Sequence, residues 1–182
     1  MKKRCFPHGF SLVESTLVVV ILGLVACMAI PCLIRHIRFC RLDSAAEVIR
    51  ADIMRARFLA VARNCYFRVL FDTAGHRYVL QEDTNANGRI DAGETVHPPT
   101  PLPEQVRFDA GDVLGPPSDP RRPPSDSVTF TGHTLVVGPD GHWASPGSIY
   151  LANDQGDHVA LTVAIAGRVR IWLWDPEARR WQ

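Results

Sequence analysis

A twelve-residue segment near the middle of the chain has oxygen-bearing side chains at the spacing of a calcium-binding loop. Segment 83–94 reads DTNANGRIDAGE and fits the pattern D-x-[DN]-x-[DN]-G-x5-E at every specified position. The residues that would bind the ion, by side chain or by backbone carbonyl, are Asp83, Asn85, Asn87, Arg89, Asp91 and Glu94. Hard oxygen ligands at this spacing fold back around one ion. The sequence therefore predicts bound calcium, the alternative being a plain Asn/Gly/Asp turn between strands.

A second group of side chains suited to binding lies in RVRIWLW, residues 168–174. Alternation along a strand separates this segment into two faces. One face carries Arg168, Arg170, Trp172 and Trp174, and the other carries Val169, Ile171 and Leu173. Basic and aromatic side chains on one face are typical of a platform for single-stranded nucleic acid. Arg168 and Arg170 are thus possible DNA contacts. The alternative is an edge strand whose arginines are solvated and whose tryptophans cover the sheet.

Signatures of catalysis are absent from the sequence. It contains no GxSxG, HExxH or Walker loop, and its seven histidines are scattered. We therefore expect a protein that is not an enzyme. The net charge of +1 and the charged fraction of 21% fit neither a disordered chain nor a strongly basic nucleic-acid binder. The five cysteines show no spacing typical of a disulfide framework or a metal site.

A long apolar segment lies close to the start of the chain. Residues 17–30 hold no polar side chain except the thiol of Cys27. With the weaker stretch from Phe10, the segment is long enough to span a bilayer core of roughly 30 Å, and a buried helix of a soluble domain is the alternative. Glu14 lies near its start, where a carboxylate costs a few kcal/mol in hydrocarbon. That cost calls for a partner, unless Glu14 reaches the membrane surface.

The residues before the apolar segment resemble a type IV prepilin signal. The matching features are the basic leader MKKRCFPHG at 1–9, the run Phe10 to Glu14, and Pro31 closing the apolar stretch. In that family a membrane prepilin peptidase cuts after the glycine and methylates the new amino terminus. The resemblance implies cleavage after Gly9 and N-methylation of Phe10. The carboxylate of Glu14 would then pair with the new amine of a neighbouring subunit during filament assembly, because paired charges are far less costly in hydrocarbon.

The remaining pattern predicts an α+β fold. Residues 10–31 form a transmembrane, filament-core helix, and 32–64 continue it as an amphipathic half whose apolar face packs on a sheet. Residues 65–182 form an antiparallel β-rich domain. Its expected strands are YFRVLF, RYVLQ, QVRF, SVTF, TLVV, SIYLA, HVALTVAI and RVRIWLW. The proline-rich stretch 111–127 is expected to be an exposed loop.

Three features together are similar to the GspH/FimT branch of type II secretion pseudopilins and minor type IV pilins. They are the prepilin segment, the helix ending LAVARN before a strand, and the pattern GSIYLAND … GRVRIW. The resemblance implies a structural, single-pass protein of the bacterial inner membrane with its carboxyl-terminal domain in the periplasm. Its partners would be other pseudopilins or minor pilins, the prepilin peptidase, the inner-membrane assembly platform and the lipid bilayer.

Two machines fit that resemblance. The first is a type II secretion system, with the protein at or near the tip of a periplasmic pseudopilus that drives export. The alternative is a minor pilin of the FimT kind that binds DNA during uptake, since GRVR at 167–170 is similar to a motif of those members. Loss of the three basic leader residues would change the net charge from +1 to −2, which argues against DNA.

Overall fold

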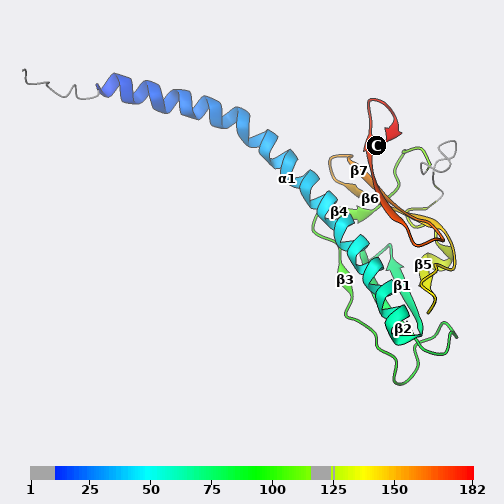
Figure 1. Cartoon of the computed structure of the whole chain (residues 1–182). Coiled ribbons are helices and arrows are strands. Elements are labelled where there is room, and N and C mark those ends of the chain that lie inside the picture. Colours follow the sequence, from blue (N-terminus) through cyan, green and yellow to red (C-terminus); the bar gives the residue numbers. More distant parts are fainter. Residues whose placement is uncertain (1–10, 116–123, 125) are drawn as a thin grey trace, which may run out of the picture. The chain divides into compact units, whose positions relative to one another are not determined.

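The computed structural model describes residues 11–115, 124 and 126–182, and its elements are shown in Figure 1. The long helix is α1 (Leu12–Arg63). The strands are β1 (Tyr66–Asp72), β2 (Arg77–Asp83), β3 (Thr100–Pro101), β4 (Val106–Phe108), β5 (Thr134–Val137), β6 (Gly147–Asn153), β7 (His158–Val163), β8 (Val169–Asp175) and β9 (Arg180–Trp181). A 3-10 turn, η1 (Thr131–His133), precedes β5. This confirms the predicted long helix followed by antiparallel strands.

The first compact unit, residues 1–37, contains the apolar part of α1. Among the described residues, α1 is the one helix that is long and apolar enough to cross a membrane. Its apolar side chains from Leu12 to Ile34 are exposed within the chain. The helix continues through Pro31, although proline removes one backbone hydrogen bond from a helix interior. Residues 11–37, the described part of this unit, therefore bury no apolar core of their own.

The second unit, residues 38–182, holds the rest of α1 and all the strands. Here α1 buries one stripe of side chains at three- and four-residue spacing, namely Leu42, Ala45, Ala46, Ile49, Ile53, Ala56 and Ala60. Small alanines in that stripe allow close approach to the strands, and the larger residues fill the space between. The apolar face predicted for this half of the helix is confirmed.

The strands form two antiparallel sheets. The first has the order β3-β2-β1-β5, and the second has the order β4-β6-β7-β8-β9. One main core joins the buried stripe of α1 to inward residues of both sheets, including Phe67, Leu135, Ile149 and Leu161. A smaller cluster lies on the other face of the second sheet, around Tyr150 and Ala160. The second sheet is thus covered on both faces over part of its area.

Three expectations need correction. SVTF is not a strand, because only Val128 forms a bridge, to Ile149. The proline-rich stretch expected to be exposed at 111–127 has a buried start, with Val113 only 2% exposed. The indole of Trp181 fixes that start by donating to the carbonyl of Gly115 at 3.1 Å. The short strands β3 and β9 were not predicted.

Candidate functional site

The loop 83–94 begins at the end of β2 with an aspartate that organises the turn. Asp83 is 3% exposed. One carboxylate oxygen accepts from the backbone N–H of Asn87 at 3.1 Å and the other from that of Gly88 at 3.0 Å. Gly88 has a φ of 75°, a backbone conformation that glycine adopts without steric cost. These hydrogen bonds to Asp83 therefore hold the first turn of the loop without the need for a bound ion.

The far end of the loop is closed by Glu94. One of its oxygens accepts from the backbone N–H of Thr84 at 2.8 Å and the hydroxyl of Thr84 at 3.1 Å. The other oxygen accepts from the backbone N–H of Asp91 at 3.0 Å. The Asp91 N–H, followed by the donors of Thr84, lowers the pKa of Glu94, because these bonds favour the ionised form. The last position of the pattern thus returns to the start of the loop.

The middle of the loop turns inward around Asp91. One carboxylate oxygen of Asp91 accepts from the side-chain amides of Asn85, at 2.6 Å, and Asn87. The carbonyl of Arg89 accepts from the amide of Gln81 at 3.0 Å. Rotation of an asparagine amide by half a turn would present its oxygen in place of its nitrogen. The loop therefore gathers the donor types of a calcium site within one turn of chain.

The same contacts also explain the loop without an ion. Among the residues that the structure describes, no three His, Cys, Asp or Glu side chains form a group that could hold a metal. The carboxylates of Asp83, Asp91 and Glu94 are each bonded to donors of the loop instead. A guanidinium nitrogen of Arg68 also donates to the carbonyl of Gly88, which brings a positive charge nearby. Binding of calcium would have to replace several of these bonds.

The predicted basic and aromatic face of β8 is partly assembled. Arg168, Arg170 and Trp172 line one groove of about 570 Å³ on the second sheet. The guanidinium carbon of Arg170 lies 5.6 Å from the centre of the Trp172 ring, within range of a cation–π contact. The indole of Trp172 donates to the hydroxyl of Thr162 at 2.9 Å. Two exposed cations and one ring therefore share a surface open to a ligand.

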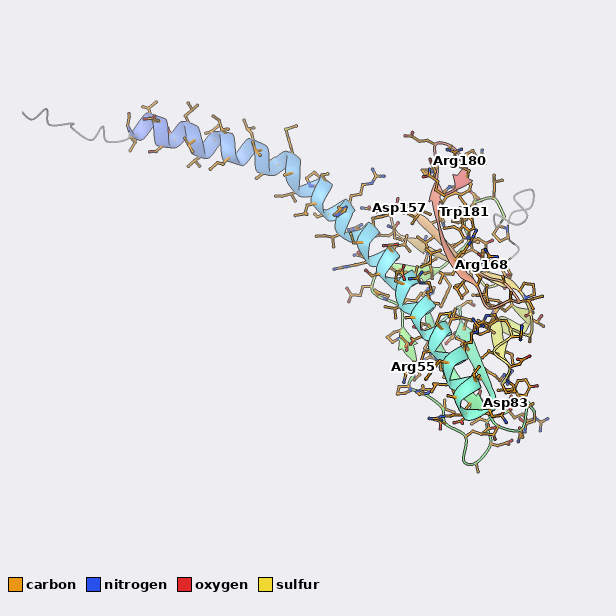
Figure 2. All side chains as sticks on the ribbon, viewed as in Figure 1. Arg55, Asp83, Asp157, Arg168, Arg180 and Trp181 are labelled. Carbon is orange, nitrogen blue, oxygen red and sulfur yellow. The ribbon has the colours of Figure 1, made fainter. Side chains whose placement is uncertain are left out.

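Trp174 does not join this surface. Its ring lies 5.1 Å from that of Trp181, and both pack on the smaller cluster around Tyr150. On the opposite face, Val169 and Ile171 pack on the main core. Figure 2 shows Asp83 at the end of the second unit where α1 finishes, and Arg180 and Trp181 at the other end. The loop and the far end of β8 are thus separate features.

Glu14 lies in the first turn of α1 and is exposed within the single chain. Gly9 and Phe10, the residues expected at the cleavage site, lie outside the described residues. The pairing of Glu14 with a neighbour's amine stays a prediction.

Three polar contacts between distant residues were missed from the sequence. The hydroxyl of Tyr78 donates to the carboxylate of Asp52 on α1 at 2.6 Å, and burial raises the pKa of this tyrosine. The guanidinium of Arg63 pairs with Glu82 at 2.8 Å, and the thiol of Cys65 donates to the same carboxylate at 3.5 Å. Burial raises the pKa of Cys65 to about 11, so the thiol stays protonated and unreactive. The contacts of Asp52 and Arg63 fasten α1 to the first sheet.

Comparisons with known proteins give the following matches. A family model described as type II transport protein GspH matches residues 45–167. A pilin-like protein, PilA1 of Thermus thermophilus, is 37% identical over 88 residues, which are 48% of this chain and 55% of that protein. The matched segment therefore spans about half of that relative.

Two solved structures of the minor pseudopilin EpsH of the type II secretion system of Vibrio cholerae are also similar. One has a TM-score of 0.49 at 16% identity and covers 72% of this chain and 95% of that chain. The other has a TM-score of 0.46 at 16% identity and covers 72% of this chain and 92% of that chain.

Proposed function

We propose that this chain is a minor pseudopilin at or near the tip of a periplasmic pseudopilus that drives protein export. The family match at residues 45–167 covers more than half of the 182 residues, so the chain belongs to the GspH family of type II transport proteins. Members of this family are structural and not enzymatic. The observation that carries the proposal is this match, which extends from the buried half of α1 to the turn before β8.

The apolar part of α1 supports a single-pass anchor in the bacterial inner membrane. Its side chains are exposed within the chain, so a lipid environment or neighbouring subunits must cover them. The carboxyl-terminal unit would then lie in the periplasm. Other pseudopilins, the prepilin peptidase and the assembly platform are the partners that follow from this arrangement.

Deletion of the gene tests the proposed machine. The deletion strain is expected to lose export of secreted proteins into the culture medium and to keep its frequency of DNA uptake, and a plasmid copy should restore export. Normal export with lost DNA uptake would contradict the secretion role and leave the DNA-binding minor pilin. Neighbouring secretin and pseudopilin genes would favour the first machine, and competence genes the second.

The tip position requires a measurement of stoichiometry. A terminal subunit occurs a fixed number of times per filament, whereas a distributed subunit increases with filament length. Quantitative mass spectrometry of pseudopili sorted by length is expected to give a ratio to the major pseudopilin that falls as the filament lengthens. A constant ratio would exclude the tip.

The alternative, a DNA-binding minor pilin, is favoured by the groove that Arg168 and Arg170 share with Trp172. If both arginines contact phosphates, replacing them with glutamine should weaken binding to all sequences and flatten the salt dependence of the affinity. The full chain in detergent and short DNA at low salt are the materials. Glutamine at Arg179 and Arg180, both exposed, is the matched control. Absence of any shift with the wild-type chain would remove this alternative.

We further propose that the loop 83–94 binds calcium weakly. Its three carboxylates, single copy and nearby Arg68 favour a Kd on the order of 10⁻⁴ to 10⁻³ M, the range of extracellular sites. At ten times the Kd, calcium would stabilise the folded chain by about 1.4 kcal/mol. Magnesium should do little, because it dehydrates reluctantly and prefers a tighter shell.

Thermal unfolding of the full chain in detergent tests the calcium site. Calcium is expected to raise the melting temperature and a chelator to lower it. Glu94→Ala should abolish the response, while Glu104→Ala, an exposed position outside the loop, should keep it. Identical melting in several Kd of calcium, about 10⁻² M, and in chelator would show that the loop is only a turn.

A further inference from the structure

Half of strand β8 lacks a neighbouring strand on its outer edge. On one side β8 pairs with β7 from Val169 to Leu173 in unbroken antiparallel register. On the other side β9 pairs with Trp174 and Asp175, and Gln182 exchanges both backbone hydrogen bonds with Leu173. No described strand pairs with the outer edge of the segment 169–171. The uncovered edge is therefore short and has defined ends.

The direction of the backbone groups on this segment follows from its register. The N–H and C=O of Leu173 point toward Gln182, away from β7. Backbone groups alternate in direction along a strand, so those of Ile171 and Val169 also point outward. At the hairpin end, the carbonyl of Arg168 accepts from the N–H of Ala164, as the same alternation requires. Two residues thus present two donors and two acceptors to the open edge.

The open edge borders a groove with a helical wall. Residues 167–169 and four exposed or half-exposed residues of α1, namely Glu47, Arg50, Ala51 and Met54, line a groove of about 390 Å³. Gly167, one of the lining residues, accepts from the guanidinium of Arg57 at its carbonyl, at 3.3 Å. An added strand would lie roughly 4.8 Å from β8, along this groove and beside the helix.

The charges at and beside the groove are mostly positive. Arg50 and Arg168 line it, and Glu47, the one acid among its described lining residues, is paired with Arg50 at 2.7 Å. Arg57 lies beside it at Gly167, and Arg170 lines the neighbouring groove of about 570 Å³. Arg168 and Arg170 are exposed. Exposed cations also protect edges against self-association, and they repel a second basic edge. The same charges attract an extended segment that carries acids.

We propose that the outer edge of β8 at 169–171 is a docking site for a short acidic, extended segment of another protein, which adds to the second sheet as a strand. Backbone bonds to Val169 and Ile171 give the affinity, and acids facing Arg168 and Arg170 give the specificity, as in other cases of strand addition. The open backbone groups favour a peptide over nucleic acid, which has no matching ladder. The inference does not depend on the machine in which the chain works.

The register makes a sharp prediction about the peptide. In an antiparallel pair, residues that exchange both hydrogen bonds have side chains on the same face. Residues opposite Val169 and Ile171 should therefore be apolar, with their N–H groups directed at β8. Residues opposite Arg168 and Arg170 should be acidic, with their N–H groups directed away. The probe that fits is Glu-Val-Glu-Val-Glu-Val-amide with a fluorophore attached to its amino end.

Peptide N-methylation tests strand addition without altering the protein. The full chain in detergent should bind the probe, and methylation of the valine amides should weaken binding by about tenfold or more, since one lost backbone bond can change an equilibrium constant by that factor. Methylation of the glutamate amides should leave it nearly unchanged. Arg168→Gln with Arg170→Gln should weaken it, while Arg179→Gln with Arg180→Gln should not. A control peptide with lysine in place of each glutamate should bind poorly.

Three results would overturn the proposal. They are equal affinity for the two methylated peptides, no binding of the acidic probe up to about 1 mM, and binding of single-stranded oligothymidine with none of the peptide. The last result would identify the surface as one for nucleic acid. Failure of the secretion role would show in export by the deletion strain and would leave the peptide measurements unaffected.

Discussion

Replacement of Gly167 by alanine should test how the β7–β8 hairpin is joined to α1. Gly167 has a φ of 90°, which L-residues rarely adopt. An added Cβ would lie 2.3 Å from a guanidinium nitrogen of Arg57, whose side chain must then swing away. The hydrogen bond from Arg57 to the Gly167 carbonyl, 3.3 Å long, would be lost with that movement. The substitution therefore combines backbone strain with loss of a contact.

The two contributions can be estimated separately. Left-handed backbone costs a non-glycine residue roughly 1–2 kcal/mol, and the hydrogen bond contributes about 0.5–1.5 kcal/mol. The sum is about 1.5–3.5 kcal/mol, and each kcal/mol lowers the melting temperature of a domain of this size by roughly 2–4 °C. Thermal unfolding of the full chain in detergent is therefore expected to show a melting temperature lower by about 3–14 °C.

Matched variants separate strain from contact. Gly156 has a φ of 83° with nothing near its missing Cβ, so Gly156→Ala should lose only the backbone contribution. In an Arg57→Ala background, the additional cost of Gly167→Ala should fall to that of Gly156→Ala, as a double-mutant cycle requires for residues in contact. A Gly167→Ala chain that melts like wild type would refute the reasoning. An unchanged cost in the Arg57→Ala background would refute the contact.

Three further predictions concern processing, assembly and the core. Mass spectrometry of the membrane-extracted protein should find an N-methylated Phe10 as the first residue, and an intact Met1 would contradict the prepilin signal. Glu14→Ala should keep membrane insertion, because it removes a charge from the apolar segment, but should reduce co-purification with other filament subunits; unchanged co-purification would remove the pairing argument. Ile53→Ala, at a site with 0% exposure, should lower the free energy of unfolding by about 2–5 kcal/mol. Phe58→Ala, at 70% exposure, should change it by less than about 0.5 kcal/mol in the same denaturant titration.

Patterns with a short sequence period predicted most of the fold. The three- and four-residue spacing of Leu42 to Ala60 identified the buried face of α1, and alternation identified β1, β2 and β5 to β8. The two-residue strands β3 and β9 were not predicted, because two residues are too few to show an alternating pattern. Pairing of Thr100 with Tyr78 and of Trp181 with Trp174 depends on neighbours far along the chain. A four-residue alternation likewise failed to reveal that Val128 forms only one bridge.

The same distinction between local and distant residues decides which candidate sites could be predicted. The ligand types of the loop could be read from the sequence because every donor lies within twelve consecutive residues. The open edge of β8 could not, since it depends on where β9 stops pairing and on α1 residues about 120 positions earlier, near Arg50. The buried polar contact between Tyr78 and Asp52 also joins distant segments. Sequence patterns describe single elements, while binding surfaces form where elements meet.

Acid should weaken the fold through His158, the first residue of β7. Its imidazole lies beneath the loop at Gly111, whose missing Cβ would be 2.6 Å from the ring. Its Nδ1 is buried and has no hydrogen-bond partner among the described residues. Burial lowers the pKa of His158, and Arg107 adds to this, while Asp109 and Asp157 oppose it. The folded chain therefore favours neutral imidazole.

The sign of the pH dependence follows from that preference. Unfolded histidine has a pKa of about 6.5, so below that pH the unfolded state binds the proton more readily than the folded state. Stability should then fall as the pH decreases from about 7 toward the lowered pKa, with a slope of up to about 1.4 kcal/mol per pH unit from this one group. His158→Gln has no titrating group, so its stability relative to wild type should improve over this window while their difference stays constant above about pH 8. If the difference in stability between the two proteins stays constant from pH 8 to pH 5, the fold does not hold His158 neutral.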